Sequence, residues 1–496
     1  MKRIFVISWE MAIFATLFTM VSVSGASGDP AVSDVRNAMK RAAAFMAGQC
    51  SSRGGYVSRY SADLSERWAE IPARDTQISV QPPGTTTVAE SFLDAYNATG
   101  DTDYLAWAEK AADAIVYGQH PAGGWHYVID FDPTGLPKWY DEFATHCWGW
   151  EEYYHYYGNC TFDDEATTAP AHILMDLYLT TLDPAFRTPL IKVLGFVLRA
   201  QFPNGAWPQR FPLRYDHVKN GHADYTSYYT LNDGVAVNNI HLLFEAWERL
   251  GDEAYRDAAL RGMNFLLAAQ LAAPQAGWAD QYNYDIKPAW GRSYEPPAVC
   301  SIQTIGTIRA LFRFYRMTGD RRFIEAVKPA LDWLDNSYIT DDPDAGYTHA
   351  YYYEIGTNRP LYTHRYGTRV EDESFTTDYV LDNLYPYGPP YTPNLKVLRR
   401  EYERLVALSP VSARAEYAAS KRPAARIVSA DAVAAVIDNL DDSGAWITDF
   451  RVPSDYFGDV FNQDWRTVTG IEVNVFARNM RTLIDYCKQN APEKQP

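Results

Sequence analysis

The feature of this 496-residue sequence that most restricts its fold is a unit of two helical stretches that occurs four times. In each unit, apolar residues at helical spacing predict a first helix. A short turn containing Asp follows, and a second helix leads into a loop that contains Gly and ends at an aromatic residue. Aspartate at such a turn is a favourable N-cap for the second helix. The predicted units cover residues 88–125, 166–207, 235–278 and 301–347.

Helix pairs that repeat about every 70 residues can stack into a solenoid or close into a ring. Gly54-Gly55-Tyr56 and Gly444-Ala445-Trp446 are weaker copies of the closing loop near the two ends of the chain. We therefore predict an all-α fold, an incomplete α/α toroid of antiparallel helix pairs with long irregular loops and minor β-structure, as one domain over residues 27–496. The closing loops then lie on one rim, where a site can be built.

Two stretches depart from the repeat. Residues 348–395 are rich in Tyr, Pro and charged residues, which predicts a loop-rich excursion with some strand. Residues 409–428 predict a surface segment. Period-two alternation of apolar and polar residues is scarce in the helical units, which agrees with the all-α prediction.

The first residues predict an export signal. Lys2 and Arg3 are followed by an apolar run over residues 11–23 and by the small residues Ser24-Gly25-Ala26, although Glu10 interrupts the apolar block. A membrane anchor is the alternative, but the uninterrupted apolar run is too short to span a bilayer. We expect a signal peptide over residues 1–26 and a secreted or periplasmic protein without membrane attachment after cleavage.

Charge narrows the choice of partners. The formal net charge of −17 argues against binding to nucleic acid or to anionic membranes. An anionic polysaccharide would need a local positive centre, from arginines or from a bound cation. Aromatic residues make up 15% of the chain; sugar rings stack on such flat faces, although most aromatic residues in a protein serve packing. We expect a monomer that acts on an acidic polysaccharide.

The five cysteines give no metal-binding pattern. They are scattered, odd in number and without metal-ligand spacing. Cys147 and Cys160 could pair in an oxidising compartment, and buried thiols are the favoured alternative.

Four loop segments concentrate polar residues: residues 161–167, 204–212, 230–237 and 288–297. The first contains Asp163, Asp164 and Glu165, and the third contains Asp233, each just before a predicted helix. Hard cations such as Ca²⁺ bind several oxygen ligands, usually carboxylates, so these acids predict a cation site. The alternative is that they only cap the helices, because negative charge is stabilised at a helix N-terminus.

The other two segments contain arginines. Trp207 offers a stacking face and Arg210 a fork for a carboxylate, or the segment is a tight turn with a buried tryptophan. Arg292 and Glu295 lie three residues apart between prolines, and a surface ion pair is the alternative to a functional role.

Taken in order, these segments resemble the pectate lyases of polysaccharide lyase family ten. The family's motifs are matched by Thr161-Phe162-Asp163-Asp164-Glu165-Ala166-Thr167, by residues 201–209, by Asn232-Asp233 and by Gly291-Arg292-Ser293-Tyr294-Glu295. The similarity covers roughly residues 161–334. Each motif alone is weak, and the ordered set is specific.

The resemblance implies cleavage of pectate, or of a related polyuronate, by calcium-assisted β-elimination. In that reaction a base removes the proton at C5, a metal and cationic groups stabilise the charge on the uronate carboxylate, and the C4 oxygen leaves. It implies that Arg292 is the catalytic base and that Asp163 and Asp233 bind calcium, with Asp164 and Glu165 as further ligands. Substrate contacts are expected from Trp207, Arg210, Glu295 and Arg365.

Departures from the family pattern leave alternatives open. Residues 277–282 differ from the family's Trp-Cys-Ala-Gln-His stretch, residues 148–157 have no counterpart, and the C-terminal third fits poorly. A changed rim could mean a different uronate polymer. A glycoside hydrolase that uses two carboxylates from among Asp163, Asp233 and Glu295, or a non-catalytic glycan-binding protein, remains possible.

Overall fold

The computed structural model describes residues 29–147, 151–218, 221–366, 374–381, 388–421, 426–456 and 464–490. The predicted signal peptide lies outside these residues. Within them, no helix combines the length and the apolar character needed to cross a membrane.

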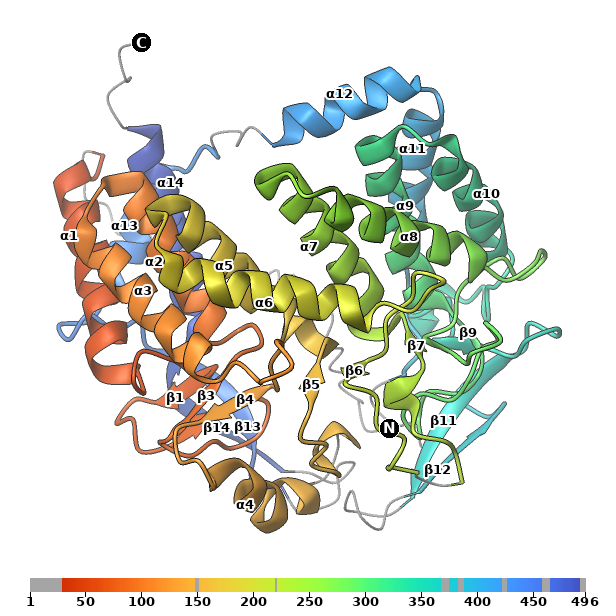
Figure 1. The fold of residues 1–496 in the computed structure, drawn as a ribbon, viewed down its shortest axis with the longest axis horizontal. Helices are drawn as coiled ribbons and strands as arrows, with labels where there is room; N and C mark the ends of the chain where they lie inside the picture. Colours follow the sequence, from red (N-terminus) through yellow and green to blue (C-terminus); the bar gives the residue numbers. More distant parts are fainter. Residues whose placement is uncertain are drawn as a thin grey trace.

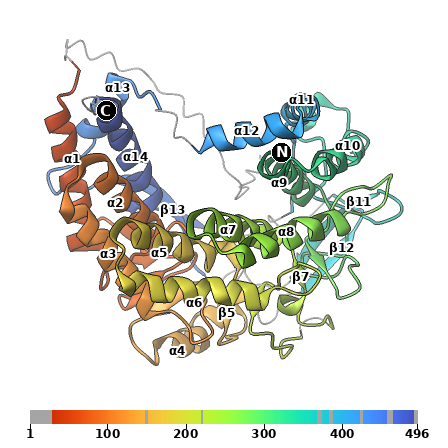
Figure 2. The same cartoon turned by 45° about the horizontal axis from the view of Figure 1, so that its top comes forward.

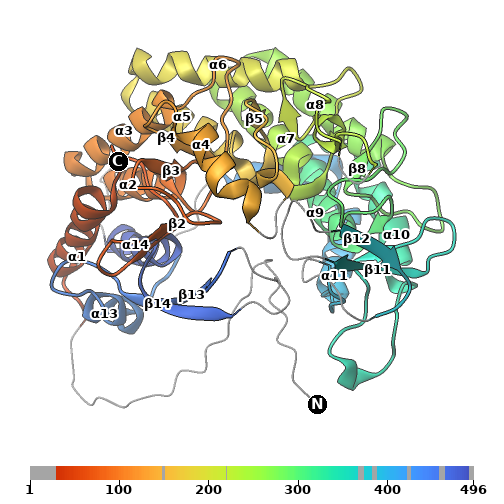
Figure 3. The same ribbon diagram turned by 90° about the horizontal axis from the view of Figure 1, so that it is seen from below.

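Antiparallel helix pairs follow one another along an arc (Figures 1 and 3). This arrangement confirms the predicted incomplete toroid, and the helix ends lie within three residues of the predicted ones in most cases. The four pairs are α2 (Thr85–Thr99) with α3 (Thr102–Tyr117), α5 (Thr168–Thr181) with α6 (Pro184–Ala200), α7 (Val235–Leu250) with α8 (Glu253–Ala268), and α9 (Ser301–Thr318) with α10 (Arg321–Asp335).

The turn within each pair has the predicted cap. The side chains of Asp101, Asp183, Asp252 and Asp320 each accept a hydrogen bond from the backbone N–H two residues later. These bonds satisfy an N–H group that has no partner within the helix, so each second helix begins at a defined residue.

A tryptophan fastens three of the four closing loops to the helix before them. Trp125, Trp207 and Trp278 are fully buried, and their indole N–H groups donate to carbonyls of α3, α6 and α8 at 2.7–2.9 Å. Trp446 makes the same bond to Val436 of α13 (Ala430–Asp438), so the weaker copy predicted near the C-terminus is a real member of the series.

Glycine lets several closing loops approach the next outer helix. A Cβ atom on Gly205 would lie 2.2 Å from the carbonyl oxygen of Arg261 in α8, and one on Gly444 would lie 2.7 Å from that of Arg41 in α1 (Val32–Phe45). Both glycines have positive φ, which suits a residue without a side chain. The outer helices therefore follow the order α13, α1, α3, α6 and α8, and the two ends of the chain are neighbours in the ring.

The remaining helices complete the two ends of the arc (Figure 2). On one side, α14 (Val473–Gln489) packs against α1 and α2, and α13 packs against α14. On the other side, α11 (Leu395–Val406) packs on α10 and α12 (Pro410–Ser420) packs on α9. The predicted surface segment over 409–428 contains α12, in which Ala413 is the buried residue. A further short helix, α4 (Gly135–Glu142), follows the first closing loop.

The β-structure is limited to short strands at one rim. In three two-stranded ladders, the segment just before the first helix of a pair forms a strand that bonds to a strand just after a closing loop. The ladders are β3 (Gln77–Ser79) with β4 (Val128–Asp130), β5 (Cys160–Thr161) with β6 (Arg210–Phe211), and β7 (Tyr229–Thr230) with β8 (Gln281–Tyr282).

Two four-stranded antiparallel sheets flank these ladders. One has the order β12-β11-β10-β9 and the other the order β13-β14-β1-β2. The predicted excursion over 348–395 supplies three of these strands, which confirms the expected strand content there. The strands are β9 (Val299–Cys300), β10 (Tyr352–Tyr353), β11 (Pro360–Tyr366), β12 (Ser374–Asp378), β13 (Thr448–Pro453), β14 (Trp465–Glu472), β1 (Arg59–Ser61) and β2 (Arg67–Trp68).

The cysteines agree with the favoured prediction. All five are buried thiols, and Cys147 and Cys160 form no disulfide.

Candidate active site

Two short 3-10 turns bring the predicted acids together at the rim. Asp163–Glu165 precedes α5 and Asn232–Gly234 precedes α7, and the two turns contact each other. Each is anchored alike, because the N–H before it bonds to a closing loop: Phe162 to Gln209 and Leu231 to Asp280, both at 2.8 Å.

The backbone of these turns is strained. Asp164 and Asp233 have φ values of 47° and 50°, in the left-handed region that costs energy for residues with a side chain. Such strain persists where the surrounding structure fixes the conformation, and here it points both carboxylates toward the other turn.

Carboxylate oxygens of Asp163, Asp164 and Asp233 lie within 4.8 Å of one another. Asp163 is fully buried, and its Oδ1 atom has no hydrogen-bond partner among the described residues. Several converging oxygens with a buried, unsatisfied carboxylate oxygen fit a hard divalent cation such as Ca²⁺.

Arg292 is the centre of the site. Its side chain is 4% exposed, and its three nitrogens donate to four carboxylates at 3.0–3.1 Å. The four acceptors are Glu152, Asp163, Asp233 and Glu295. The first three come from distant parts of the chain and the whole group is buried, so the expected alternative of a surface ion pair with Glu295 is wrong.

The four carboxylates around Arg292 can carry more negative charge than its single positive charge neutralises. Burial raises the pKa of Glu295 to about 7, although Arg292 opposes this. Burial and the neighbouring Asp163 hold the pKa of Asp233 well above its usual value. Burial would also raise the pKa of Asp163, but Arg292 and hydrogen bonds bring it below the usual value. The site therefore has a surplus of negative charge that a cation or protons must balance.

The same arrangement fixes the state of Arg292. Burial alone would lower its pKa, but Glu152, Glu295 and Asp163 raise it well above the usual value. With these four ion pairs in place, the guanidinium is charged.

Arg210 lies behind the carboxylates of Asp163, Asp164 and Asp233 rather than in an open groove. It is 1% exposed, and its guanidinium packs over the rings of Tyr127 and Tyr157 at 5.2 and 4.6 Å from their centroids. The hydroxyl of Tyr127 donates to Asp163. Arg210 thus adds a buried positive charge near Asp163.

The other three residues predicted to contact substrate lie in different surroundings. The ring of Trp207 is fully buried in the helical core, so the prediction of a stacking face there is wrong. Glu295 is 1% exposed, and its oxygens accept bonds from Asn232 and from the side chain and backbone of Arg292. Arg365 lies in β11, and its side chain is outside the described residues.

Sequence reasoning missed Glu152, Glu70 and Tyr127. Glu152 is 4% exposed and bonds Arg292 from a loop for which no family counterpart was found. Burial raises the pKa of Glu70 to about 7, and its carboxylate accepts a bond from Tyr153 at 2.9 Å. The pair Glu151-Glu152 within an aromatic stretch was the one available signal, because acids are rare in apolar surroundings without a partner.

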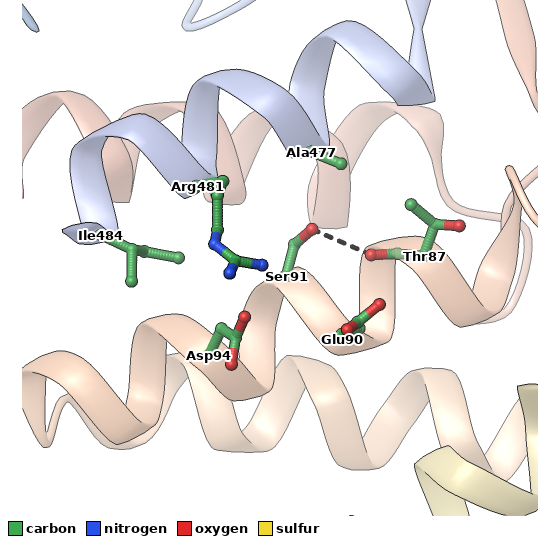
Figure 4. A pocket seen from close by; sticks show the side chains of 7 residues that line it. All are labelled: Thr87, Glu90, Ser91, Asp94, Ala477, Arg481 and Ile484. Carbon is green, nitrogen blue, oxygen red and sulfur yellow. Dashed lines mark hydrogen bonds between the residues drawn. The ribbon is translucent and has the colours of Figure 1, made fainter. Parts of the chain in front are cut away.

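Two of the hollows among the described residues lie beside charged side chains. A small one lies beside Arg292 and is lined by Glu151, His217, His222, Ala223, Tyr225, Gly291 and Ser293. A larger one, of about 80 Å³, lies between α2 and α14, where Glu90, Asp94 and Arg481 face one another (Figure 4).

Comparison with known proteins gives one family match, and it covers the site. Residues 149–378 match the family model described as pectic acid lyase. No curated relative matches the chain.

Among solved structures, a variant of the family 10 polysaccharide lyase of Cellvibrio cellulosa in complex with trigalacturonic acid is 17% identical. The match covers 64% of this chain and 98% of that one, with a TM-score of 0.42. A GH76 α-mannanase of Bacteroides thetaiotaomicron is 10% identical, covers 93% and 98% of the two chains, and has a TM-score of 0.43.

The family match covers every segment that supplies Glu152, Asp163, Asp233 and Arg292. It confirms the resemblance that the ordered motifs indicated. The residues that build the site therefore lie in the part of the chain that matches the pectic acid lyase family model, and this match supports a polysaccharide lyase.

Proposed function

We propose that the protein cleaves pectate, or a closely related polyuronate, by calcium-assisted β-elimination at Arg292. The observation that carries this proposal is the convergence of Arg292 with Asp163 and Asp233, which lie 129 and 59 residues away in the sequence. A cationic group and a cation site beside each other suit a substrate carboxylate, which both can contact.

Asp163, Asp164 and Asp233 would hold the calcium ion. When bound, calcium would neutralise the uronate carboxylate and stabilise the extra negative charge that develops as the C5 proton leaves. The unpartnered Oδ1 atom of Asp163 and the surplus of acids around Arg292 support this assignment.

Arg292 would take the C5 proton. Glu152, Glu295 and Asp163 hold its pKa well above the usual value. The base role therefore requires that Asp163 and Asp233 turn their charge away from Arg292 in the complex and that the guanidinium first releases a proton. Glu152 and Glu295, which bind its Nε, its Nη1 and its backbone N–H, would then keep the guanidinium in place. Because these two carboxylates still bind the planar guanidinium, its orientation stays fixed.

The proposal includes the cellular location. The basic residues, apolar run and small residues over residues 2–26 are typical of an export signal. An enzyme that degrades a large extracellular polysaccharide must also meet it outside the cytoplasm. Sequencing the N-terminus of the protein recovered from culture medium or periplasm tests this point, and an intact Met1 in that fraction would contradict cleavage.

Detection of unsaturated products tests the reaction. A lyase leaves a double bond at the new non-reducing end, which absorbs ultraviolet light, whereas a hydrolase produces reducing ends without that absorbance. We expect absorbance to rise with polygalacturonate or another member of a polyuronate panel. Reducing ends without absorbance would contradict β-elimination.

Arg292→Lys tests the assignment of the base. We expect this variant to lose turnover while still binding the polysaccharide, because Lys keeps the charge but not the planar, three-nitrogen geometry. Arg256→Lys, at an exposed site on α8, is the matched control and should retain full activity. Full activity of Arg292→Lys would remove Arg292 from the base role.

A further inference from the structure

β-Elimination needs a second proton transfer that the residues named so far do not supply. When the C5–H bond breaks and the C4–C5 double bond forms, the C4–O4 bond breaks and O4 leaves with a negative charge. An alkoxide is a poor leaving group, so a general acid that protonates O4 lowers the barrier. A candidate must lie beside Arg292, remain protonated at the working pH and have a hydrogen that is not already donated.

Most tyrosine hydroxyls packed around the site already have an acceptor. Tyr127 donates to Asp163, Tyr153 donates to Glu70 at 2.9 Å, and Tyr352 donates to Asp280 at 2.9 Å. Their protons support the acid cluster and are not directed toward a substrate.

Tyr225 differs from these residues. It is 5% exposed, and its hydroxyl oxygen is buried without a hydrogen-bond partner among the described residues. Its backbone carbonyl accepts a bond from Gln281 at 2.9 Å, which fixes the segment that carries it. A buried hydroxyl without a partner is unfavourable, so such a group is expected where a ligand completes the bond.

The small hollow beside Arg292 gives that ligand a place. Tyr225 forms one wall, and Gly291 and Ser293, the residues on either side of Arg292, form another. The volume of the hollow is about 10 Å³, which suits a single oxygen atom rather than a sugar ring.

Burial keeps the phenol protonated. It raises the pKa of Tyr225 well above its usual value, although the nearby positive charge of Arg292 opposes this. The hydroxyl therefore holds its proton at neutral and moderately alkaline pH, where a polyuronate is fully ionised.

We infer that Tyr225 is the catalytic acid that donates its hydroxyl proton to O4 of the leaving sugar. This inference rests on the proposed function. Arg292 first releases one guanidinium proton to solvent and then takes the C5 proton. The C5–H electron pair forms the C4–C5 double bond, and the C4–O4 pair leaves on O4, which takes the proton from Tyr225. The resulting tyrosinate regains a proton from solvent, so both side chains end the turnover as they began it.

Leaving-group dependence tests the inference. We compare the wild type, Tyr225→Phe and the control Tyr228→Phe on two substrates: an oligogalacturonate, and a methyl galacturonide that carries a nitrophenoxy group at C4. Tyr228 lies in the same segment and does not line the hollow. Nitrophenolate is a good leaving group and needs no proton.

We expect Tyr225→Phe to lower kcat on the oligogalacturonate by about 10²–10⁴-fold with little change in KM, as is usual for loss of a general acid. On the nitrophenoxy substrate its rate should stay within a few-fold of the wild type. Tyr228→Phe should match the wild type on both. An equal loss on both substrates, or no loss on the oligogalacturonate, would overturn the role of Tyr225.

Two further measurements keep the outcome clear. If Tyr225→Phe loses the thermal transition of the wild type, the leaving-group series is run on the wild type alone. A rate that depends only weakly on leaving-group pKa supports an acid, and a steep dependence overturns it. If the wild type forms neither unsaturated sugar nor nitrophenolate, the proposed function fails, whereas wild-type turnover with unaltered Tyr225→Phe defeats only this inference.

Discussion

At the residue scale, the position of Arg292 is set by carboxylates that the sequence separates widely. Glu295 is three residues away, whereas Asp233, Asp163 and Glu152 are 59, 129 and 140 residues away. The ordered motifs contained three of these four acids. Glu152 could not be predicted, because it lies in an aromatic loop outside the repeat and its role depends on a contact with Arg292 that only the folded chain creates.

Glu152→Gln tests the importance of that missed residue. The change keeps the size of the side chain but removes the charge that faces Nε of Arg292, so the guanidinium should shift. We expect turnover to fall by roughly 100-fold, the effect of a displacement of about 1 Å in an active site. Steady-state kinetics measure this, with Glu253→Gln on the exposed start of α8 as control.

The same variant should not be unstable. Burial raises the pKa of Glu152, so its folded-state pKa lies above the unfolded value and its ionisation costs stability as the pH rises. Removing the charge therefore leaves the Tm at neutral pH equal to or above that of the wild type. A large fall in Tm together with full turnover would contradict the assignment.

At the element scale, helical periodicity and the Asp caps predicted the helices well. α7 and α9 begin at the first residues of the predicted units 235–278 and 301–347, and each ends at a glycine in the left-handed region. The closure of the ring by α13 and α1 was not predicted. Arg41 bonds to the carbonyl of Asp441, 400 residues away, and no local pattern reports such a contact.

Trp207→Phe separates packing from substrate binding. The variant loses the indole bond to Val197 and part of the buried ring. We expect it to destabilise the protein by about 2 kcal/mol in denaturant unfolding and to leave KM unchanged. Trp278→Phe, at the equivalent place in the next unit, should behave alike. A raised KM for Trp207→Phe with unchanged stability would restore the stacking role that the structure contradicts.

The acids between α2 and α14 give a pH-dependent prediction. Burial raises the pKa of Asp94, and nearby Lys488 and Arg481 oppose this only in part. Because the folded pKa lies above the unfolded one, the stability contribution is present at low pH and is lost as the pH rises through the folded value. Asp94→Asn should therefore raise the Tm at about pH 8, and the gain should disappear toward about pH 4.

Differential scanning calorimetry across that range checks the expectation. The exposed Asp257→Asn serves as control, since no comparable burial acts on it. A gain in Tm that is equal at both ends of the range would show that the charge of Asp94 is not its source.

At the scale of the whole molecule, an acidic chain handles an acidic substrate by concentrating charge at one rim. The formal net charge is −17, yet the inner helices α5 and α7 begin at turns that face a charged guanidinium. The ring brings these turns together because successive pairs place equivalent loops on the same rim. The repeat therefore predicted the rim on which a site would lie. The chemistry of the site depends on the acidic residues in the two turns that precede α5 and α7.

The central claim is that Asp163 and Asp233 form a calcium site beside Arg292. Calorimetric titration of calcium into the substrate-free protein tests it most directly, with Asp163→Asn as the test variant and Asp176→Asn, at a partly exposed ion pair between α5 and Arg249 of α7, as control. We predict that the wild type and Asp176→Asn bind one calcium ion alike and that Asp163→Asn binds at least about tenfold more weakly. Equal calcium affinity in Asp163→Asn and the wild type would contradict the account.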